Sequence, residues 1–520
     1  MSIVSPATTL ERLAQQRPDA PAVVVGEHAW SRAAVSEQER SLAAVLAGLG
    51  VGPGDRVAVL RRNATLHLTA FAACARLGAI FVPVNFRLPA AEAARVLHDA
   101  RPAVVICGPR HAEQVETVLT RFPQTIWVVD DADPVTGEPA VGLGAHWLGL
   151  AALPGRAGTE PDPAPVPGEQ IAMLQYTSGS TGDPKGVCLT YGNLEASWQA
   201  TAKALSLGPD EVVLSVAPFG HVGGFNALTL QTVLMGGTDV IQRQFDAGRS
   251  LLEIERHRVT AMFGVPAMYQ AMAAHPDFAP RDLRSVRAAL AGGAPMPVPL
   301  TQRYLDHGVG MVVSWGMTEL CGGGSFLPKE EFAVRAGSVG LPGDGLAVRV
   351  VDERSGAEVA EGEVGELVVR GPSVTPGYWR RERSAEDFTE HGWFRTGDLA
   401  RRDADGYLYL AGRCKDTIIS GGENIRPAEI ENLLVMHPEV ARVAVVGAPD
   451  PRWGECPVAV IEPRPGCGTP SVEQVRDFLA PDLARFKMPR RVVSLPQLPL
   501  GVSGKIDYVA LRRLVTGVPE

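Results

Sequence analysis

The segment YTSGSTGDPKG at residues 176–186 concentrates groups that can bind an anion. Two serines, two threonines and three glycines accompany one lysine, Lys185. Backbone N–H groups and hydroxyls in such a loop can turn toward a phosphate while the lysine supplies positive charge. The segment is not a Walker loop, because two residues separate Gly182 from Lys185 and that motif needs them adjacent. A short Gly/Ser loop can also be a plain turn. Only the whole eleven-residue segment is specific enough to indicate anion binding.

Lysine is scarce, which gives weight to each position that keeps it. Of the 49 basic residues only six are lysines. They are Lys185, Lys203, Lys329, Lys415, Lys487 and Lys505. A compact ammonium on a flexible stem differs from a guanidinium in shape and hydration. A retained lysine therefore favours a specific role, and chance stays an alternative for any single one.

The composition is that of a globular protein with more than one domain. The chain has 520 residues, of which 45% are hydrophobic and 21% charged, and these values exclude a wholly disordered or fibrous protein. A formal net charge of −9 argues against nucleic acid as the main ligand. No apolar run reaches the roughly 18–20 residues of a membrane span, so no integral membrane contact is expected.

The N-terminus and the cysteines indicate a cytoplasmic protein. The first residues show no basic region followed by an apolar core, so we expect no signal peptide. Seven scattered cysteines without a C-x-x-C pair are typical of reduced thiols rather than of a disulfide frame or a zinc site.

Strand and helix patterns alternate along most of the chain, which predicts an α/β fold with parallel strands. In the first 150 residues we expect strands at 21–25, 56–60, 103–106 and 126–129 and helices at 32–49 and 64–77. A second run predicts strands at 239–242, 259–263, 285–290 and 311–314 and helices at 246–257, 266–274 and 297–306. Residues 151–168 are rich in Pro and Gly, which predicts a surface linker or loop between subdomains. After about residue 340 short strands dominate, and a compact α+β pattern follows from about 415.

Six motifs in order make the sequence resemble the adenylate-forming (ANL) enzymes, which include acyl-CoA synthetases, peptide-synthetase adenylation domains and luciferases. The motifs are YTSGSTGDPKG (176–186), AGGAPM (291–296), SWGMTEL (314–320), GWFRTGDLA (392–400), GRCKDTIISGGENIRPAEIE (412–431) and GVSGK (501–505). The resemblance implies a large N-terminal adenylation domain of layered sheets with helices at 1–411, a hinge at 412–416 and a small mobile α+β lid domain at 417–520.

The resemblance also implies an ATP site. Its phosphate-binding residues would be Thr177, Ser178, Gly179, Ser180, Thr181, Gly182 and Lys185. Its adenine-binding residues would be Gly292, Gly293, Ala294, Pro295, Trp315, Gly316 and Met317. Asp398 would accept hydrogen bonds from the ribose hydroxyls, and Arg413 would reach the ribose or phosphate side. Out of context, a pair such as Asp398 and Arg413 would more often be a surface ion pair.

Three residues near the phosphates would take part in the chemistry. Thr318 would touch the α-phosphate and Glu319 would bind Mg²⁺, since a hard cation can bridge a carboxylate and phosphates. His221, in VAPFGHVGGFNAL, could stand near the substrate carboxylate, or could simply be hydrogen-bonded in a loop.

Lys505 is the residue most expected to be catalytic. The resemblance makes it the ammonium that bridges the substrate carboxylate and the α-phosphate, where a cation offsets the repulsion between two anions. Lys415 matches the hinge, about which the lid would rotate after adenylation. That rotation would bring a loop of Ser420, Gly421, Gly422 and Glu423 to the CoA side.

Candidate walls of an acyl pocket are Phe225, Asn226, Val265, Met268, Cys321 and Gly322, any of which could instead be core. The resemblance implies an ATP-, Mg²⁺- and CoA-dependent ligase that makes an acyl-adenylate from a fatty or aromatic acid. Alternatives are an acyl carrier protein as acceptor, nitrite as the activated group, or a nucleotide-binding protein without catalysis. The oligomeric state is not predicted.

Overall fold

The computed structural model describes residues 2–131, 146–156, 158–159, 161–163, 165–178, 184–420, 423–501 and 505–517. Contacts within the chain divide it into two compact units. The larger unit comprises residues 1–347 and 370–388, and the smaller unit comprises residues 348–369 and 389–520. The predicted domains at 1–411, 412–416 and 417–520 rest on the change of sequence pattern and on the family resemblance, and they stay a prediction.

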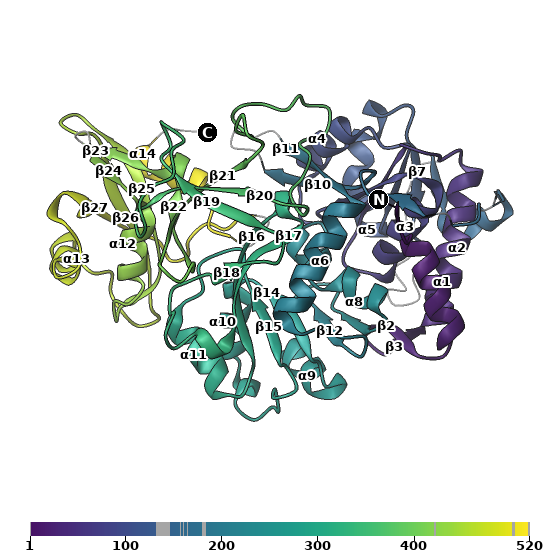
Figure 1. Ribbon diagram of the computed structural model, residues 1–520, viewed down its shortest axis with the longest axis horizontal. Helices are drawn as coiled ribbons and strands as arrows, with labels where there is room; N and C mark the ends of the chain where they lie inside the picture. The colour runs from purple at the N-terminus through teal and green to yellow at the C-terminus, as the bar shows by residue number, and fades with distance from the viewer. Residues whose placement is uncertain are drawn as a thin grey trace. The chain divides into compact units, whose positions relative to one another are not determined.

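Two main sheets form the larger unit (Figure 1). The first has the order β11(Pro184–Thr190), β10(Ile171–Ser178), β5(Ile80–Val84), β4(Arg56–Leu60), β6(Val104–Cys107), β7(Ile126–Val129) and β8(Trp147–Gly149). Its strands are parallel except β11, which forms an antiparallel hairpin with β10. The predicted strand–helix alternation with parallel pairing is therefore confirmed here.

The second sheet carries the later strands of the larger unit. Its order is β18(Leu341–Pro342), β17(Gly322–Leu327), β16(Met311–Met317), β15(Ala288–Ala291), β14(Ala261–Gly264), β12(Val212–Ser215), β13(Thr238–Ile241), β2(Pro21–Val25) and β3(His28–Ser31). The strands from β16 to β2 are parallel to one another. The strand predicted at 21–25 is β2, and it pairs with β13 of the second sheet, which local periodicity does not predict.

Helices cover these sheets. The strands β1(Ser2–Ile3) and β9(Val166–Pro167) form a separate two-stranded sheet. The helices of the larger unit are α1(Pro6–Gln16), α2(Arg32–Gly48), α3(Thr65–Leu77), α4(Ala90–Ala100), α5(Pro109–Val115), α6(Tyr191–Leu205), α7(Val222–Phe225), α8(Thr229–Met235), α9(Ala247–His257), α10(Pro266–Ala274) and α11(Val298–Asp306). α1 and α2 lie side by side (Figure 1). Within the described ranges, no helix is both long and apolar enough to cross a bilayer.

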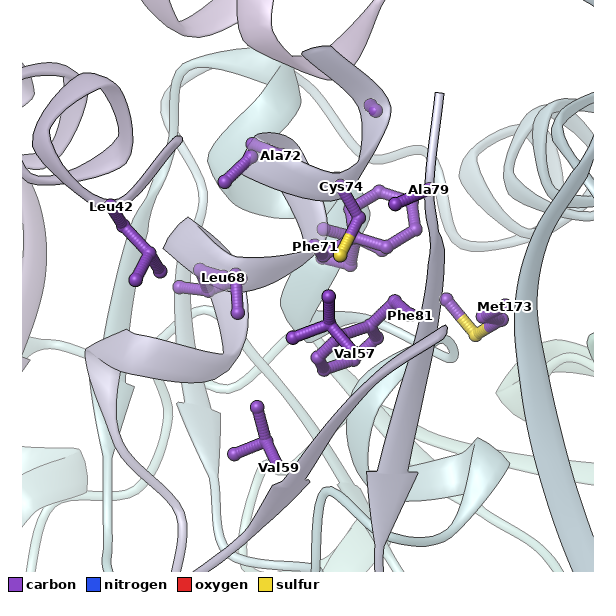
Figure 2. Packing of buried hydrophobic residues seen from close by; sticks show 14 of the residues in the cluster. Leu42, Val57, Val59, Leu68, Phe71, Ala72, Cys74, Ala79, Phe81 and Met173 are labelled. Atoms are coloured by element: carbon purple, nitrogen blue, oxygen red, sulfur yellow. The ribbon is translucent and has the colours of Figure 1, made fainter. Parts of the chain in front are cut away.

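The core of the larger unit is built around α3. Its sequence, TLHLTAFAACARL, is apolar on nearly every face, and a helix of that kind is stable only when buried. Phe71 of α3 packs edge-on against Phe81 of β5, with ring centres 6.0 Å apart, beside Met173 of β10 (Figure 2). The same cluster includes Val25 and Ile241 of the second sheet, so α3 ties both sheets together. Truncating a buried Phe of this kind typically costs about 3–5 kcal/mol of stability.

The smaller unit contains two further sheets. One has the order β19(Ala347–Val351), β20(Gly365–Arg370), β21(Phe394–Arg402) and β22(Leu408–Arg413). The other comprises β24(Glu423–Ile425), β23(Ile418–Ser420), β26(Gly454–Pro463), β25(Val440–Asp450) and β27(Arg491–Ser494). Its helices are α12(Pro427–Leu434), α13(Val472–Leu479) and α14(Tyr508–Thr516). This mixture confirms the predicted α+β pattern of the C-terminal region.

Candidate active site

The β10–β11 hairpin carries the two ends of the predicted phosphate loop. Thr177 faces Lys185 and Ser178 faces Pro184 across the hairpin. Gly186 is required by packing, because a Cβ there would lie 2.9 Å from the ring of Tyr176. The loop residues Gly179, Ser180, Thr181 and Gly182 lie outside the described residues, so their predicted phosphate contacts stay a prediction.

A second segment docks onto this hairpin and brings Tyr378 beside Lys185. The Trp379 backbone N–H donates to the Gly186 carbonyl at 2.7 Å, and the Cys188 N–H donates to the Gly377 carbonyl at 3.0 Å. The Lys185 ammonium nitrogen lies 5.1 Å from the centre of the Tyr378 ring, a cation–π distance. Sequence reasoning missed Tyr378, and the only available signal was an aromatic residue in a Pro- and Gly-containing loop.

Tyr378 connects Lys185 to the predicted magnesium ligand. Its hydroxyl donates to Glu319 Oε1 at 2.9 Å. Burial and the neighbouring Glu319 carboxylate raise the pKa of the Tyr378 phenol, so it remains a protonated donor. Glu319 itself is 8% exposed and lies on the 3₁₀ turn η4(Thr318–Leu320) with Thr318, directly after β16. Glu319 is thus a nearly buried carboxylate that accepts a hydrogen bond from a neutral phenol.

The predicted adenine residues lie where the parallel strands end, the usual ligand position in open α/β sheets. Gly293, Ala294 and Pro295 follow β15 and are exposed, while Gly292 is buried. Trp315, on the adjacent β16, is 5% exposed. Gly316 permits a close approach that no side chain would allow, because a Cβ there would lie 1.8 Å from the Gly322 carbonyl oxygen. Met317 pairs with Gly322 across β16 and β17.

His221 caps the start of α7 and is fixed by neutral amides. Its Nε2 lies 3.0 Å from the side-chain nitrogen of Asn85. The loop before it is held by Asn63, whose amide donates to the Ala217 carbonyl at 2.9 Å and whose Oδ1 accepts from Phe219 N–H at 2.9 Å. Gln175 donates to the Gly220 carbonyl at 2.6 Å. Sequence reasoning missed all three amides, since an isolated Asn or Gln carries no motif.

The six candidate acyl-pocket residues do not fall in one cluster. Phe225 and Cys321 are fully buried in the cluster around α3, whereas Val265 and Met268 pack in a second cluster. Gly322 continues from Cys321 into β17. Asn226 is the unusual member: it is 1% exposed, and both atoms of its amide are buried without a hydrogen-bond partner in the described part of the chain.

The smaller unit holds a second group of predicted site residues. Asp398 on β21 faces Arg413 on β22, and Arg413 Nε lies 2.6 Å from Asp398 Oδ1. The charges of Asp398 and Arg413 both act on the Lys505 ammonium. Although its side chain is exposed, crowding by protein atoms and the Arg413 guanidinium lower the pKa of the Lys505 ammonium, and Asp398 opposes that shift. The structure thus brings Asp398, Arg413 and Lys505 together from separate segments.

The predicted hinge and CoA-side loop follow directly on this group. Lys415 lies on the 3₁₀ turn η6(Cys414–Asp416), and its neighbour Asp416 pairs with Arg512 at 2.6 Å. Ser420 ends β23 and pairs with Glu423 of β24. Gly421 and Gly422 lie outside the described residues.

The described residues of the larger unit do not supply a full set of metal ligands. Within the described residues, no group of three or more His, Cys, Asp or Glu side chains could hold a metal ion. Mg²⁺ is commonly bound by one or two carboxylates together with substrate phosphates, and Glu319 beside the lysine-bearing hairpin fits that mode. A carboxylate next to an anion-binding lysine suits a substrate that carries phosphates and a divalent cation.

The chain belongs to the AMP-binding enzyme family. Residues 10–379 match that family, and residues 429–505 match the AMP-binding enzyme C-terminal domain. The chain is 41% identical over 502 residues, 96% of its length, to a feruloyl-CoA synthase of an Amycolatopsis species, covering 97% of that protein. It is therefore an AMP-forming acid–thiol ligase that works through an acyl-adenylate and uses ATP, Mg²⁺ and CoA.

Two solved structures resemble the whole chain. O-succinylbenzoate coenzyme A synthetase (MenE) from Bacillus subtilis, in complex with ATP and magnesium ion, superposes with a TM-score of 0.83 at 30% identity, covering 98% of each chain. The anthranilate CoA ligase AuaEII, in complex with anthranoyl-AMP, has a TM-score of 0.88 at 27% identity, covering 99% of this chain and 98% of that one. These matches confirm the predicted fold class.

Proposed function

We propose that this ligase activates an aromatic carboxylic acid that carries a polar substituent and transfers it to CoA. The observation that carries the proposal is the buried, unsatisfied amide of Asn226 next to Phe225. An unpaired buried amide is costly, and a ligand hydroxyl or amine would satisfy it. The names of a feruloyl-CoA synthase and an anthranilate CoA ligase among similar proteins also favour an aromatic acid.

The first step would join the acid to AMP. A carboxylate oxygen attacks the α-phosphorus of ATP, the bond to the β-phosphate oxygen breaks, and pyrophosphate leaves. Lys185 and the hairpin residues Thr177 and Ser178 would hold the β- and γ-phosphates. Lys505 would lie between the carboxylate and the α-phosphate, where its charge offsets their repulsion as they approach. Mg²⁺, bound at Glu319, would neutralise phosphate charge.

The remaining residues would orient the reactants. Asp398 would accept hydrogen bonds from the ribose, with Arg413 as its ion-pair partner. His221, held by Asn85, would border the acid. In the second step the CoA sulfur attacks the acyl carbon and AMP leaves. A turn at Lys415 would exchange Lys505 for the loop at 420–423 between the two steps.

The acid is identified by pyrophosphate release in a panel of hydroxycinnamic, aminobenzoic and unsubstituted aromatic acids, fatty acids and nitrite. We expect the hydroxylated or amino-substituted aromatic acids to give the fastest release and mass spectrometry to show their CoA thioesters. Release only with nitrite, or only with fatty acids, would overturn the proposal. Acyl transfer to a carrier protein but not to CoA would overturn the acceptor.

Asn226→Leu tests the observation directly. Loss of one buried hydrogen bond should lower kcat/KM for the substituted acid by about tenfold relative to the unsubstituted acid. Thr232→Val is the matched control, because Thr232 Oγ1 is also buried without a hydrogen-bond partner in the described residues but is not a candidate pocket residue. An equal change of selectivity in both variants would contradict the role of Asn226.

We also place the enzyme in the cytoplasm. The seven cysteines are all unpaired, and five of them are buried. Burial raises the pKa of the Cys74, Cys107 and Cys321 thiols, which keeps them protonated and unreactive. Free thiols of this kind suit a reducing compartment.

A further inference from the structure

A cavity of about 370 Å³ lies on the larger unit beside the phosphate-loop hairpin, and none of the predicted site residues is among its described lining residues. One face of α4 forms its floor, and the end of the 3₁₀ turn η1(Glu116–Arg121), the first residue of β11 and Arg381 form its walls. A volume of this size falls in the range of small-molecule sites.

The lining of the cavity is strongly cationic. Arg95, Arg121 and Arg381 reach it from three separate segments. All three are exposed, and none of them forms an ion pair with another residue in the part of the chain that the structure describes, unlike buried Arg76, which pairs with Glu39 at 2.7 Å. Among the described lining residues, Asp99 carries the single carboxylate. Three guanidinium groups around one cavity are notable in a chain whose net charge is −9.

The Asp99 carboxylate is already engaged. Tyr176 donates its hydroxyl to Asp99 Oδ2 at 2.7 Å. Burial and this hydrogen bond raise the pKa of the Tyr176 phenol, so it stays a donor. The cavity therefore offers guanidinium donors to an incoming ligand, while the Asp99 carboxylate is engaged by Tyr176. Guanidinium groups bind phosphate oxygens in a bidentate manner.

We propose that this cavity is a second anion site that binds a small polyphosphate, distinct from the nucleotide site. Three arginines match an anion of three or more negative charges better than a monocarboxylate, which one arginine can neutralise. Two sources fit this chemistry: pyrophosphate, which the ligase itself releases, and the phosphate groups of the CoA nucleotide.

The position of the cavity couples it to the phosphate-loop hairpin. Asp99 contacts Tyr176 of β10, the residue before Thr177, and Pro184, which lines the cavity, faces Ser178. Both stems of the hairpin thus border the cavity or a residue that lines it. An anion in the cavity will therefore change the affinity of the chain for ATP, and ATP will change the affinity for the anion by the same factor.

Binding is tested by calorimetry on the full chain with Mg²⁺ and saturating α,β-methylene-ATP, which fills the nucleotide site. Pyrophosphate, 3′,5′-ADP and inorganic phosphate are titrated separately. We expect pyrophosphate or 3′,5′-ADP to bind, and the Kd to rise at least about tenfold in Arg95→Gln/Arg121→Gln/Arg381→Gln, as the loss of charge-assisted hydrogen bonds predicts. The stronger of the two ligands identifies the source.

The control removes the same charge elsewhere. Arg12, Arg354 and Arg464 are exposed, and Arg12→Gln/Arg354→Gln/Arg464→Gln should leave the Kd within twofold. Tyr176→Phe should keep anion binding but reduce its effect on ATP affinity. Failure of all three anions to bind the ATP-analogue-saturated chain, or equal weakening in the pocket variant and the control, would overturn the proposal. Neither result would affect the ligase assay of the preceding proposal.

Discussion

The two units of this ligase hold their predicted site residues by different means. In the larger unit, Glu319 accepts a hydrogen bond from the neutral Tyr378 and His221 lies against the neutral Asn85. In the smaller unit, Asp398 and Arg413 form a direct ion pair beside Lys505. Neutral donors leave the charge of a carboxylate available for a metal, whereas an ion pair consumes much of it.

This difference indicates a division of work. The larger unit would supply charges that meet a cation and phosphates, with uncharged groups as supports. The smaller unit would supply one ammonium, that of Lys505, whose pKa is lowered by burial and by Arg413 and is raised by Asp398. Substitutions in each unit test this division.

The largest effect should come from Lys505→Ala. Removing the ammonium leaves two anions to react without a cation between them, so pyrophosphate release should fall by about 10²–10³-fold. ATP binding, measured by calorimetry, should stay within about threefold, since Lys505 is not a predicted ground-state phosphate ligand. The exposed Lys329→Ala is the matched control. Unchanged pyrophosphate release would remove Lys505 from this role.

Glu319→Gln tests the larger unit. An amide binds Mg²⁺ more weakly than a carboxylate, so pyrophosphate release should fall by about 10²-fold and the Mg²⁺ concentration for half-maximal rate should rise. Tyr378→Phe keeps the charge and removes one hydrogen bond, which predicts a loss of about fivefold. The exposed Glu330→Gln is the control. If Glu319→Gln left the Mg²⁺ dependence unaltered, the metal role would be wrong.

Lys415→Pro tests whether the smaller unit must move. Proline fixes φ, so a turn at residue 415 would be blocked. Adenylation, followed as single-turnover pyrophosphate release, should be spared, while thioester formation should slow by about tenfold or more, as expected for a gating motion. Lys415→Ala should retain both steps. Equal loss of both steps in Lys415→Pro would argue against rotation.

The smallest effect concerns two buried acids, one in each unit. Burial raises the pKa of Asp239 in the larger unit and of Glu431 in the smaller unit to about 7. Between about pH 4 and pH 7 these two carboxyl groups are protonated in the folded chain but ionised in the unfolded chain. The free energy of unfolding therefore falls as the pH rises through that window and is flat above it. Tm should drop by a few degrees from pH 5 to pH 8.

Asp239→Asn and Glu431→Gln should each flatten part of that decline. Ser215 donates to Asp239 Oδ1 at 2.6 Å, and Tyr508 donates to Glu431 Oε1 at 3.0 Å, so the amides can keep these bonds. Differential scanning calorimetry at both pH values provides the measurement. A Tm that rises with pH, or a decline that both variants retain, would show that these acids are ionised in the folded chain.

Much of the fold was predictable because it rests on local patterns. The strands at 56–60 and 126–129 and the helix at 266–274 were predicted with the bounds that the structure has. Their apolar periodicity follows from burial of one or both faces. The pairing of β21 with β22, which sets Asp398 opposite Arg413, could not be predicted, because the register of two strands depends on the whole sheet.

The candidate site was predictable only where its residues stand together in short sequence motifs. Lys185 and Glu319 stand in motifs, but Tyr378, Asn63 and Asn85 do not, and their roles arise from contacts with residues far away in the chain. The hydrogen bond from Asn63 to Ala217 spans 154 positions. No local rule anticipates such a contact, since it depends on how two sheets pack.

The sequence by itself determined the family, the class of reaction and the order of most strands and helices, because hydrophobic periodicity and short motifs are local properties. Tertiary structure alone decided that β2 joins the second sheet, that Tyr378 stands between Lys185 and Glu319, and that three arginines surround one cavity. Each of these outcomes depends on which distant segments share a surface. That choice is set by the packing of the whole unit around α3 and not by any single stretch of residues.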